Sequence, residues 1–234
     1  AGWRDDGVEG GNRVMRKAIC GGPEDGRASP WLGIPADDYE GHMGSAGVDQ
    51  LAALSRAFAE VYGRLRPARV VVLGCATGNG FEHIDVGMTR RLVGVDIHPG
   101  YLAVARRRHH RLAGILEFHC RSVETCELGA GSLDLVFAGL LFEYVEPGPL
   151  LERIASWLAA GATFVAVLQL PSVVTAPVSP TAYESLGALA PVMRLVPPTE
   201  FRRMADNAGL TPVLEREIPL RGGKVFHEAH LFRR

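Results

Sequence analysis

The pattern of hydrophobic and polar residues divides the chain into short apolar runs separated by longer amphipathic stretches. Two runs of mostly branched apolar residues, 70–73 and 92–95, are too short for helices and are typical of strands buried on both faces. Apolar residues recur at three- and four-residue steps over 49–65, which predicts an amphipathic helix that Pro67 ends. Strands that alternate with helices favour an α/β fold.

The rest of the chain continues this alternation, with predicted helices over 101–112, 148–160 and 199–208 and predicted strands over 115–120, 133–139 and 162–169. We expect Gly161 to end the second of these helices. The stretches 212–219 and 224–232 predict two strands joined by a glycine pair, which is typical of a hairpin. His227 and His230 alternate across the last strand, so at most one of them is expected to face the core.

Two parts of the chain lack any helical or strand period. Residues 1–30 carry scattered glycines and charges and predict a loose N-terminal arm. Residues 170–198 contain six prolines and only a short helical piece near 183–189. Long irregular stretches in compact domains are usually functional, so we expect a substrate lid there. The predicted organisation is thus an arm, a lid or helix over 31–66, and a main domain over 67–234.

A glycine-rich loop joins the first two predicted strands. It holds Gly74, Gly78 and Gly80, a helix is predicted to start within Phe81–Met88, and the second strand ends in Asp96. Glycine lets a ligand lie against the main chain, and the amides at a helix start favour polar or anionic groups. An acid at the end of the second strand can accept hydrogen bonds from a ribose diol. Together these features predict an adenosine-binding crevice at the carboxyl ends of parallel strands.

Composition narrows the class of function without naming one. The 234 residues are 47% apolar and 22% charged, with a formal net charge of −1, which is ordinary for a globular domain and gives no reason to expect a nucleic-acid or membrane surface. No apolar run reaches the roughly 18 residues of a membrane span, and the first residues lack the apolar region of a signal peptide. We therefore expect a cytoplasmic protein. No Cys/His cluster has metal-ligand spacing, so no metal is expected.

The order of the glycines indicates which adenosine cofactor is bound. The dinucleotide fingerprint is G-x-G-x-x-G, whereas Gly74, Gly78 and Gly80 give the reverse arrangement, G-x-x-x-G-x-G. This loop resembles motif I of the class I S-adenosylmethionine-dependent methyltransferases, and Asp96 falls where that family keeps its ribose-binding acid. The resemblance implies S-adenosyl-L-methionine as cofactor. It also implies a Rossmann-like, seven-stranded, mostly parallel sheet flanked by helices, with an antiparallel last strand and an N-terminal lid segment.

The same resemblance implies cofactor contacts at Tyr39, Gly74, Cys75, Ala76, Thr77, Gly78, Gly80, Asp96, Ile97, Ser122, Val123 and Ala138. One departure concerns the adenine contact. The family usually has an Asp after its third strand, but the stretch Arg121-Ser-Val-Glu124 contains none. Ser122, the Val123 amide and Glu124 are the candidates to replace it.

No catalytic base stands out in the sequence. Tyr39, His42 and Met43 lie in a short stretch, expected to be a loop, ahead of the first predicted helix. Glu143 and Tyr144 follow the fourth predicted strand, whose end faces the methyl group in the family. The catalytic candidates are therefore His42, Glu143 and Tyr144, each of which has an alternative interpretation as an ordinary packing or surface residue.

These observations favour a methyltransferase that acts on a small-molecule metabolite by in-line methyl transfer. Gly139-Leu-Leu-Phe142 stands where base methylases carry an Asn/Asp-Pro-Pro-aromatic motif, which argues against a nucleic-acid base as acceptor. The alternatives are an RNA- or protein-directed methyltransferase, an aminopropyltransferase of the spermidine-synthase type and a non-catalytic S-adenosylmethionine-binding subunit. A homodimer is a further possibility that the sequence leaves open.

Overall fold

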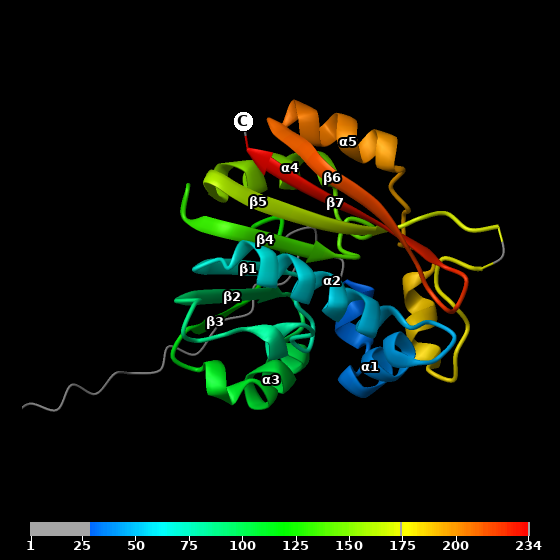
Figure 1. Ribbon diagram of the computed structural model, residues 1–234. Helices are drawn as coiled ribbons and strands as arrows, with labels where there is room; N and C mark the ends of the chain where they lie inside the picture. The colour runs from blue at the N-terminus through cyan, green and yellow to red at the C-terminus, as the bar shows by residue number, and fades with distance from the viewer. Residues whose placement is uncertain (1–28, 174, 234) are drawn as a thin grey trace, which may run out of the picture.

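The computed structural model describes residues 29–173 and 175–233, which form a twisted seven-stranded sheet with helices on both faces (Figure 1). The strand order is β3-β2-β1-β4-β5-β7-β6, so the chain reverses its direction of winding between β1 and β4. Ligands in open α/β sheets bind at the carboxyl ends of the strands beside such a reversal. The arm predicted for residues 1–30 lies outside the described residues, apart from its last two positions.

Five parallel strands form the larger part of the sheet, and the branched side chains of the three at its centre are buried on both faces. Val71 and Val72 of one strand, for example, point into different hydrophobic cores. A strand that is covered on both faces requires this nearly continuous apolar run. The five strands are β1 (Arg69–Leu73), β2 (Arg91–Asp96), β3 (Leu116–Cys120), β4 (Leu133–Gly139) and β5 (Leu158–Gln169).

A C-terminal hairpin completes the sheet and confirms its predicted antiparallel ending. It consists of β6 (Leu210–Pro219) and β7 (Val225–Arg233). β7 lies between β5 and β6 and runs antiparallel to both. Gly223, in the turn between them, has a φ of +81°, which a residue with a side chain rarely adopts.

Helices cover both faces and enclose two hydrophobic cores. One core contains side chains of α1 (Ala36–Gly44), α2 (Gln50–Leu65) and α3 (Pro99–Arg108). The other contains side chains of α4 (Pro147–Trp157) and α5 (Pro198–Asn207). The short 3₁₀ helices are η1 (Pro30–Gly33), η2 (Phe81–His83), η3 (His110–Leu112) and η4 (Glu184–Leu189). No helix of the described ranges is long and apolar enough to cross a membrane.

The prediction that a helix starts within Phe81–Met88 is wrong, because only the short 3₁₀ helix η2 forms there. The Asp85 side chain accepts a hydrogen bond from the Gly87 N–H at 2.8 Å, and the Asp85 carbonyl accepts from Thr89 at 2.9 Å. The Tyr62 hydroxyl also accepts from the Asp85 N–H at 2.9 Å. These bonds close a turn at Asp85, so the backbone cannot continue as a helix.

The stretch that carries Tyr39, His42 and Met43 is a helix, α1, rather than the expected loop. Its buried residues lie three, four and one positions apart, so they share one helix face. Acidic residues at positions 37 and 38 occupy the first turn, where they interact favourably with the helix dipole. A helix of nine residues with two glycines has little intrinsic propensity, which is why packing decides its conformation.

Two smaller expectations also need correction. The fourth helix ends at Trp157, before Gly161, which lies inside β5 with a φ of +76°. His227 and His230 are both buried, because β7 is an interior strand with covered faces. The Nδ1 atom of His230 lies 2.6 Å from the Arg64 guanidinium of α2, and His227 approaches Glu215 at 3.4 Å.

Helix α1 and residues 177–189 pack together, and we call these two segments the cover (Figure 1). Ser185 donates a hydrogen bond to Asp38 at 2.6 Å, and His42 Nδ1 lies 2.9 Å from the Thr181 hydroxyl. Tyr183 packs directly on Gly41, where a methyl group would lie only 2.1 Å from the ring. The close approach therefore requires glycine at position 41.

Gly41→Ala is expected to loosen the cover and destabilise the protein by about 1–3 kcal/mol, because the added methyl group overpacks the Tyr183 contact. Gly44→Ala is the matched control, since its methyl group would lie 3.6 Å from Leu51, an ordinary van der Waals distance. Differential scanning calorimetry measures both. Equal midpoints for the two variants would contradict the packing described here.

Candidate functional site

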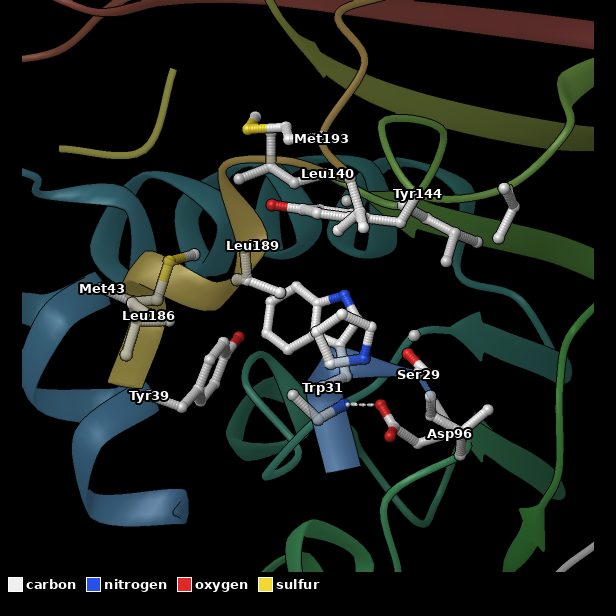
Figure 2. A pocket seen from close by; sticks show the side chains of 18 of the residues that line it. Ser29, Trp31, Tyr39, Met43, Asp96, Leu140, Tyr144, Leu186, Leu189 and Met193 are labelled. Atoms are coloured by element: carbon white, nitrogen blue, oxygen red, sulfur yellow. Dashed lines mark hydrogen bonds between the residues drawn. The ribbon is translucent and has the colours of Figure 1, made fainter. Parts of the chain in front are cut away.

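A cavity of about 380 Å³ lies at the carboxyl ends of the parallel strands (Figure 2). Residues that follow or end β1, β2, β3, β4 and β5 all line it: Gly74, Asp96, Ser122, Gly139 and Gln169. The cover and η1 supply the opposite wall. The cavity thus occupies the position where this type of sheet binds ligands.

Asp96 is fixed at one end of the cavity by two backbone hydrogen bonds. One carboxylate oxygen accepts from the Ala76 N–H and the other from the His98 N–H, each at 2.8 Å. The side chain is buried, and burial raises the pKa of Asp96 to about 6, although the backbone N–H groups act in the opposite direction. Each carboxylate oxygen has about two acceptor positions, so both can still accept from a ligand.

The glycine loop is divided between residues that line the cavity and residues that pack behind it. Gly74 and Ala76 line it, and both have positive φ, +64° and +45°. Gly78 and Gly80 do not line it, because they pack against His109 and Phe58, where an added methyl group would lie 2.9 and 3.0 Å from the rings.

The other predicted loop contacts also lie behind the cavity wall. Cys75 is buried beside Gly94, and the Thr77 hydroxyl donates a hydrogen bond to Glu40 of α1 at 2.5 Å. Arg108 of α3 binds the same carboxylate at 2.6 Å. This group joins α1 to the loop, and a cofactor role for Cys75, Thr77, Gly78 and Gly80 stays a prediction.

The stretch after β3 provides apolar and polar groups close to Asp96. Ile97, Ser122, Val123 and Glu124 line the cavity. The Ser122 hydroxyl accepts a hydrogen bond from the Glu124 N–H at 3.2 Å. No aspartate lies in this stretch, so Ser122, the Val123 amide and Glu124 remain the candidates for an adenine contact.

The end of β4 approaches the middle of the cavity. Ala138 is fully buried and does not line the cavity, whereas Gly139 and Leu140 do. Leu140 has a φ of +54°, an unfavourable conformation for a residue with a side chain. Backbone strain of this kind is concentrated at functional sites.

Three aromatic rings surround the middle of the cavity. Figure 2 shows Trp31 of η1 reaching in between Tyr39 and Tyr144. The Trp31 ring lies edge-on to Tyr144 at 5.0 Å and to Tyr39 at 6.2 Å between centroids. Burial raises the pKa of both tyrosines far above neutrality, so their hydroxyls stay protonated and can donate hydrogen bonds. Trp31 was not among the residues predicted for the site, although a tryptophan beside a proline at the start of the predicted lid was a usable signal.

The far end of the cavity, under the cover, is apolar with a small polar group. Its apolar wall includes Met43, Val178, Leu186, Leu189, Val192 and Met193. Its polar side chains are His42, Gln50, Gln169 and Lys224. Burial and the nearby Lys224 charge lower the pKa of His42, so its imidazole is neutral at pH 7. The sequence analysis missed the two glutamines and the lysine, because each lies at an element boundary without a motif. We call this end the covered chamber.

Glu143 lies behind the cavity rather than in it. One of its carboxylate oxygens accepts from the Gln169 N–H at 2.7 Å, and its carbonyl accepts from the Arg194 N–H at 2.8 Å. The other carboxylate oxygen has no hydrogen-bond partner among the described residues. Burial raises the pKa of Glu143 to about 7. Glu143 therefore fixes the end of β5, and a direct catalytic role stays a prediction. No cluster of metal-ligating side chains occurs in the described part of the chain.

Comparisons with known proteins agree with this geometry. Residues 71–166 match the family model described as a methyltransferase domain. Among solved structures, magnesium protoporphyrin IX methyltransferase from Synechocystis PCC 6803 is similar at a TM-score of 0.65 and 13% identity, covering 85% of this chain and 93% of that one. Geranyl diphosphate C-methyltransferase from Streptomyces coelicolor A3(2) is similar at a TM-score of 0.63 and 13% identity, and the match covers 80% of this chain and 82% of that one. Both were crystallised with S-adenosyl-L-homocysteine, and the second also with Mg²⁺ and geranyl diphosphate.

A third solved structure shows that this fold is used for more than one reaction. The cyclase SpnF gives a TM-score of 0.62 at 12% identity, covering 76% of this chain and 81% of that one. At these identities the likeness concerns the fold, and function has to be argued from the site. Among curated proteins, no sequence relative of the chain was found.

The affinity for S-adenosylhomocysteine is expected to fall as the pH drops through about 6, because protonation of Asp96 removes the charge that accepts the ribose hydroxyls. Asp96→Asn should bind about ten- to a hundredfold more weakly than the wild type at pH 7.5 and lose the pH dependence. Calorimetric titration at pH 5 and pH 7.5 measures both effects. A pH-independent affinity of the wild type, or an unchanged affinity of the variant, would show that Asp96 does not bind the ribose.

Proposed function

We propose that the chain is a class I S-adenosylmethionine-dependent methyltransferase that methylates a small, largely apolar molecule held in the covered chamber. One observation carries this proposal. A single cavity connects the Asp96 carboxylate, at the end where the cofactor is expected, with an apolar chamber beneath the cover. A methyl donor and an acceptor can therefore meet inside one enclosed space.

The residues around Asp96 fit an S-adenosyl cofactor. The buried carboxylate keeps acceptor capacity toward the cavity and suits a ribose diol. Ile97 and Val123 offer apolar surface for a planar base. At Gly74, which lines the cavity, an added methyl group would lie 3.2 Å from Leu141, so a side chain there would crowd the cavity wall. The bound cofactor supplies an electrophilic methyl group, and the protein supplies alignment and a dry environment.

The covered chamber favours a small acceptor over a macromolecule. The cavity volume lies within the roughly 300–1,000 Å³ that is usual for small-molecule sites. Contacts of Tyr183, Ser185 and Thr181 with α1 hold the cover closed over it. A nucleic-acid base or a protein side chain would reach the methyl donor only if these contacts opened. We therefore propose that residues 31–66 and 170–198 together enclose the acceptor.

His42 is the proposed proton acceptor for an acceptor molecule that must lose a proton. Its Nδ1 atom is oriented by the Thr181 hydroxyl, and its imidazole is neutral, so Nε2 is available toward the cavity. Tyr39 and Tyr144 stay protonated and serve as hydrogen-bond donors instead. This divides the roles of the polar groups: the imidazole accepts a proton, and the phenols orient the acceptor.

The class of acceptor can be tested with S-adenosylmethionine that carries a tritiated methyl group. The protein is incubated with the small-molecule and the macromolecular fractions of a cell extract, and label is counted in organic-extractable and acid-precipitable material. We expect label in the organic-extractable fraction, and less of it with Asp96→Asn at a limiting concentration of the methyl donor, because that variant should bind the cofactor more weakly. Label in precipitated RNA or protein would refute the small-molecule acceptor. Cofactor binding without any transfer would favour the non-catalytic subunit.

With an acceptor found in this way, His42→Ala is expected to lower kcat about a hundredfold or more while leaving S-adenosylhomocysteine affinity unchanged, because it removes the proposed base. Thr181→Val leaves the imidazole in place but removes the hydrogen bond that orients it, together with the bond that the hydroxyl accepts from the Tyr183 N–H at 3.2 Å, and should have a smaller effect. Steady-state kinetics and calorimetry separate these effects. An unchanged kcat in His42→Ala would mean that the acceptor needs no base or finds it elsewhere.

A further inference from the structure

Lys224 is a buried cation that lines the covered chamber. It precedes β7, and its side chain is 2% exposed. Its ammonium group donates one hydrogen bond, to the Pro177 carbonyl at 2.7 Å. An ammonium has three donors, and within the described residues this one bond leaves two of them without a partner.

No carboxylate among the described residues forms an ion pair with Lys224. The neighbouring Arg221, by contrast, points out to solvent. Its guanidinium lies 4.0 Å from the Asp49 carboxylate. Burial lowers the pKa of Lys224 to about 8, and no acidic group offsets that effect. A buried charge without a partner is unfavourable, so such groups are usually completed by a ligand or a counter-ion.

The groups around Lys224 are neutral amides that bond to one another and to the main chain, so they bring no negative charge. Gln50 donates to the Gln169 side chain at 3.0 Å, and Gln169 donates to the Pro177 carbonyl at 3.0 Å. The remaining ionisable side chain at this end of the cavity is His42, which is neutral. The electrostatic character of this corner therefore favours an anion.

Lys224 lies away from the expected cofactor position. Asp96 ends β2, whereas Lys224 borders β7, and the two strands are four places apart in the sheet. Four strand spacings amount to about 19 Å. The lysine therefore faces the acceptor side of the cavity rather than the ribose side.

We propose that Lys224 binds an anionic group of the methyl acceptor, so that the substrate class of this site is a small amphipathic acid. The apolar walls of the covered chamber hold the body of the molecule, and the lysine holds its charged end. This inference rests on the proposed function, since it assigns the acceptor to the same cavity.

The test measures binding of hexanoate, octanoate and decanoate to protein saturated with S-adenosylhomocysteine, beside the corresponding neutral amides. We expect at least one acid to bind about tenfold or more tightly than its amide, as a charge-assisted contact predicts. Lys224→Met should abolish that preference while leaving amide binding unchanged, and Lys224→Arg should retain it. Calorimetric titration at pH 7 gives all the affinities.

Arg221→Met is the matched control, because it removes a positive charge from the same hairpin outside the cavity. It should leave the preference for the acid unchanged. A preference that survives Lys224→Met, or the absence of binding by every acid, would overturn the proposal. Weakened S-adenosylhomocysteine binding in Lys224→Met would assign the lysine to the cofactor instead. Failure of the wild type to bind S-adenosylhomocysteine at all would refute the proposed function itself.

Discussion

The shape of the cavity depends on the two backbone hydrogen bonds that the Asp96 carboxylate accepts. Its two oxygens join the turn after β1, through Ala76, to the turn after β2, through His98. Ala76 adopts a positive φ that a residue with a side chain tolerates poorly, so the loop needs this external bond to keep its path. The same carboxylate thus builds the loop and, in the proposed function, is also the group that binds the ribose.

The architecture was predictable because its signals are local and strong. The runs in β1, β2 and β4 and the periodicity of α2 appear in the sequence as clear patterns, and the glycine pair before β7 marks the closing hairpin. The errors occurred where tertiary contacts override propensity. Asp85 closes a turn with the help of Tyr62 from α2, and α1 forms because it packs under Tyr183. Neither contact can be inferred from neighbouring residues.

The site was predictable only at its cofactor end. The glycine order and Asp96 form a motif, so Gly74, Ala76 and Asp96 could be placed at the cavity from sequence alone. Gly78 and Gly80 belong to the same motif. They pack so closely against His109 and Phe58 that packing alone explains why these positions are glycine. At the acceptor end the polar side chains come from α2, β5 and the hairpin turn. Residues so far apart in sequence form no motif, so only the fold brings them together.

The bonds that hold the cover also set an order of assembly. His42 and Thr181 are separated by 139 residues in the chain, and Asp38 and Ser185 by 147. Contacts between such distant positions close large loops and form late in folding, whereas the turns around Asp96 connect segments only about twenty residues apart. During synthesis the crevice at Asp96 can take shape while the partner of α1 has yet to leave the ribosome. The two halves of one cavity are therefore completed at different times, and the covered chamber is the last to close.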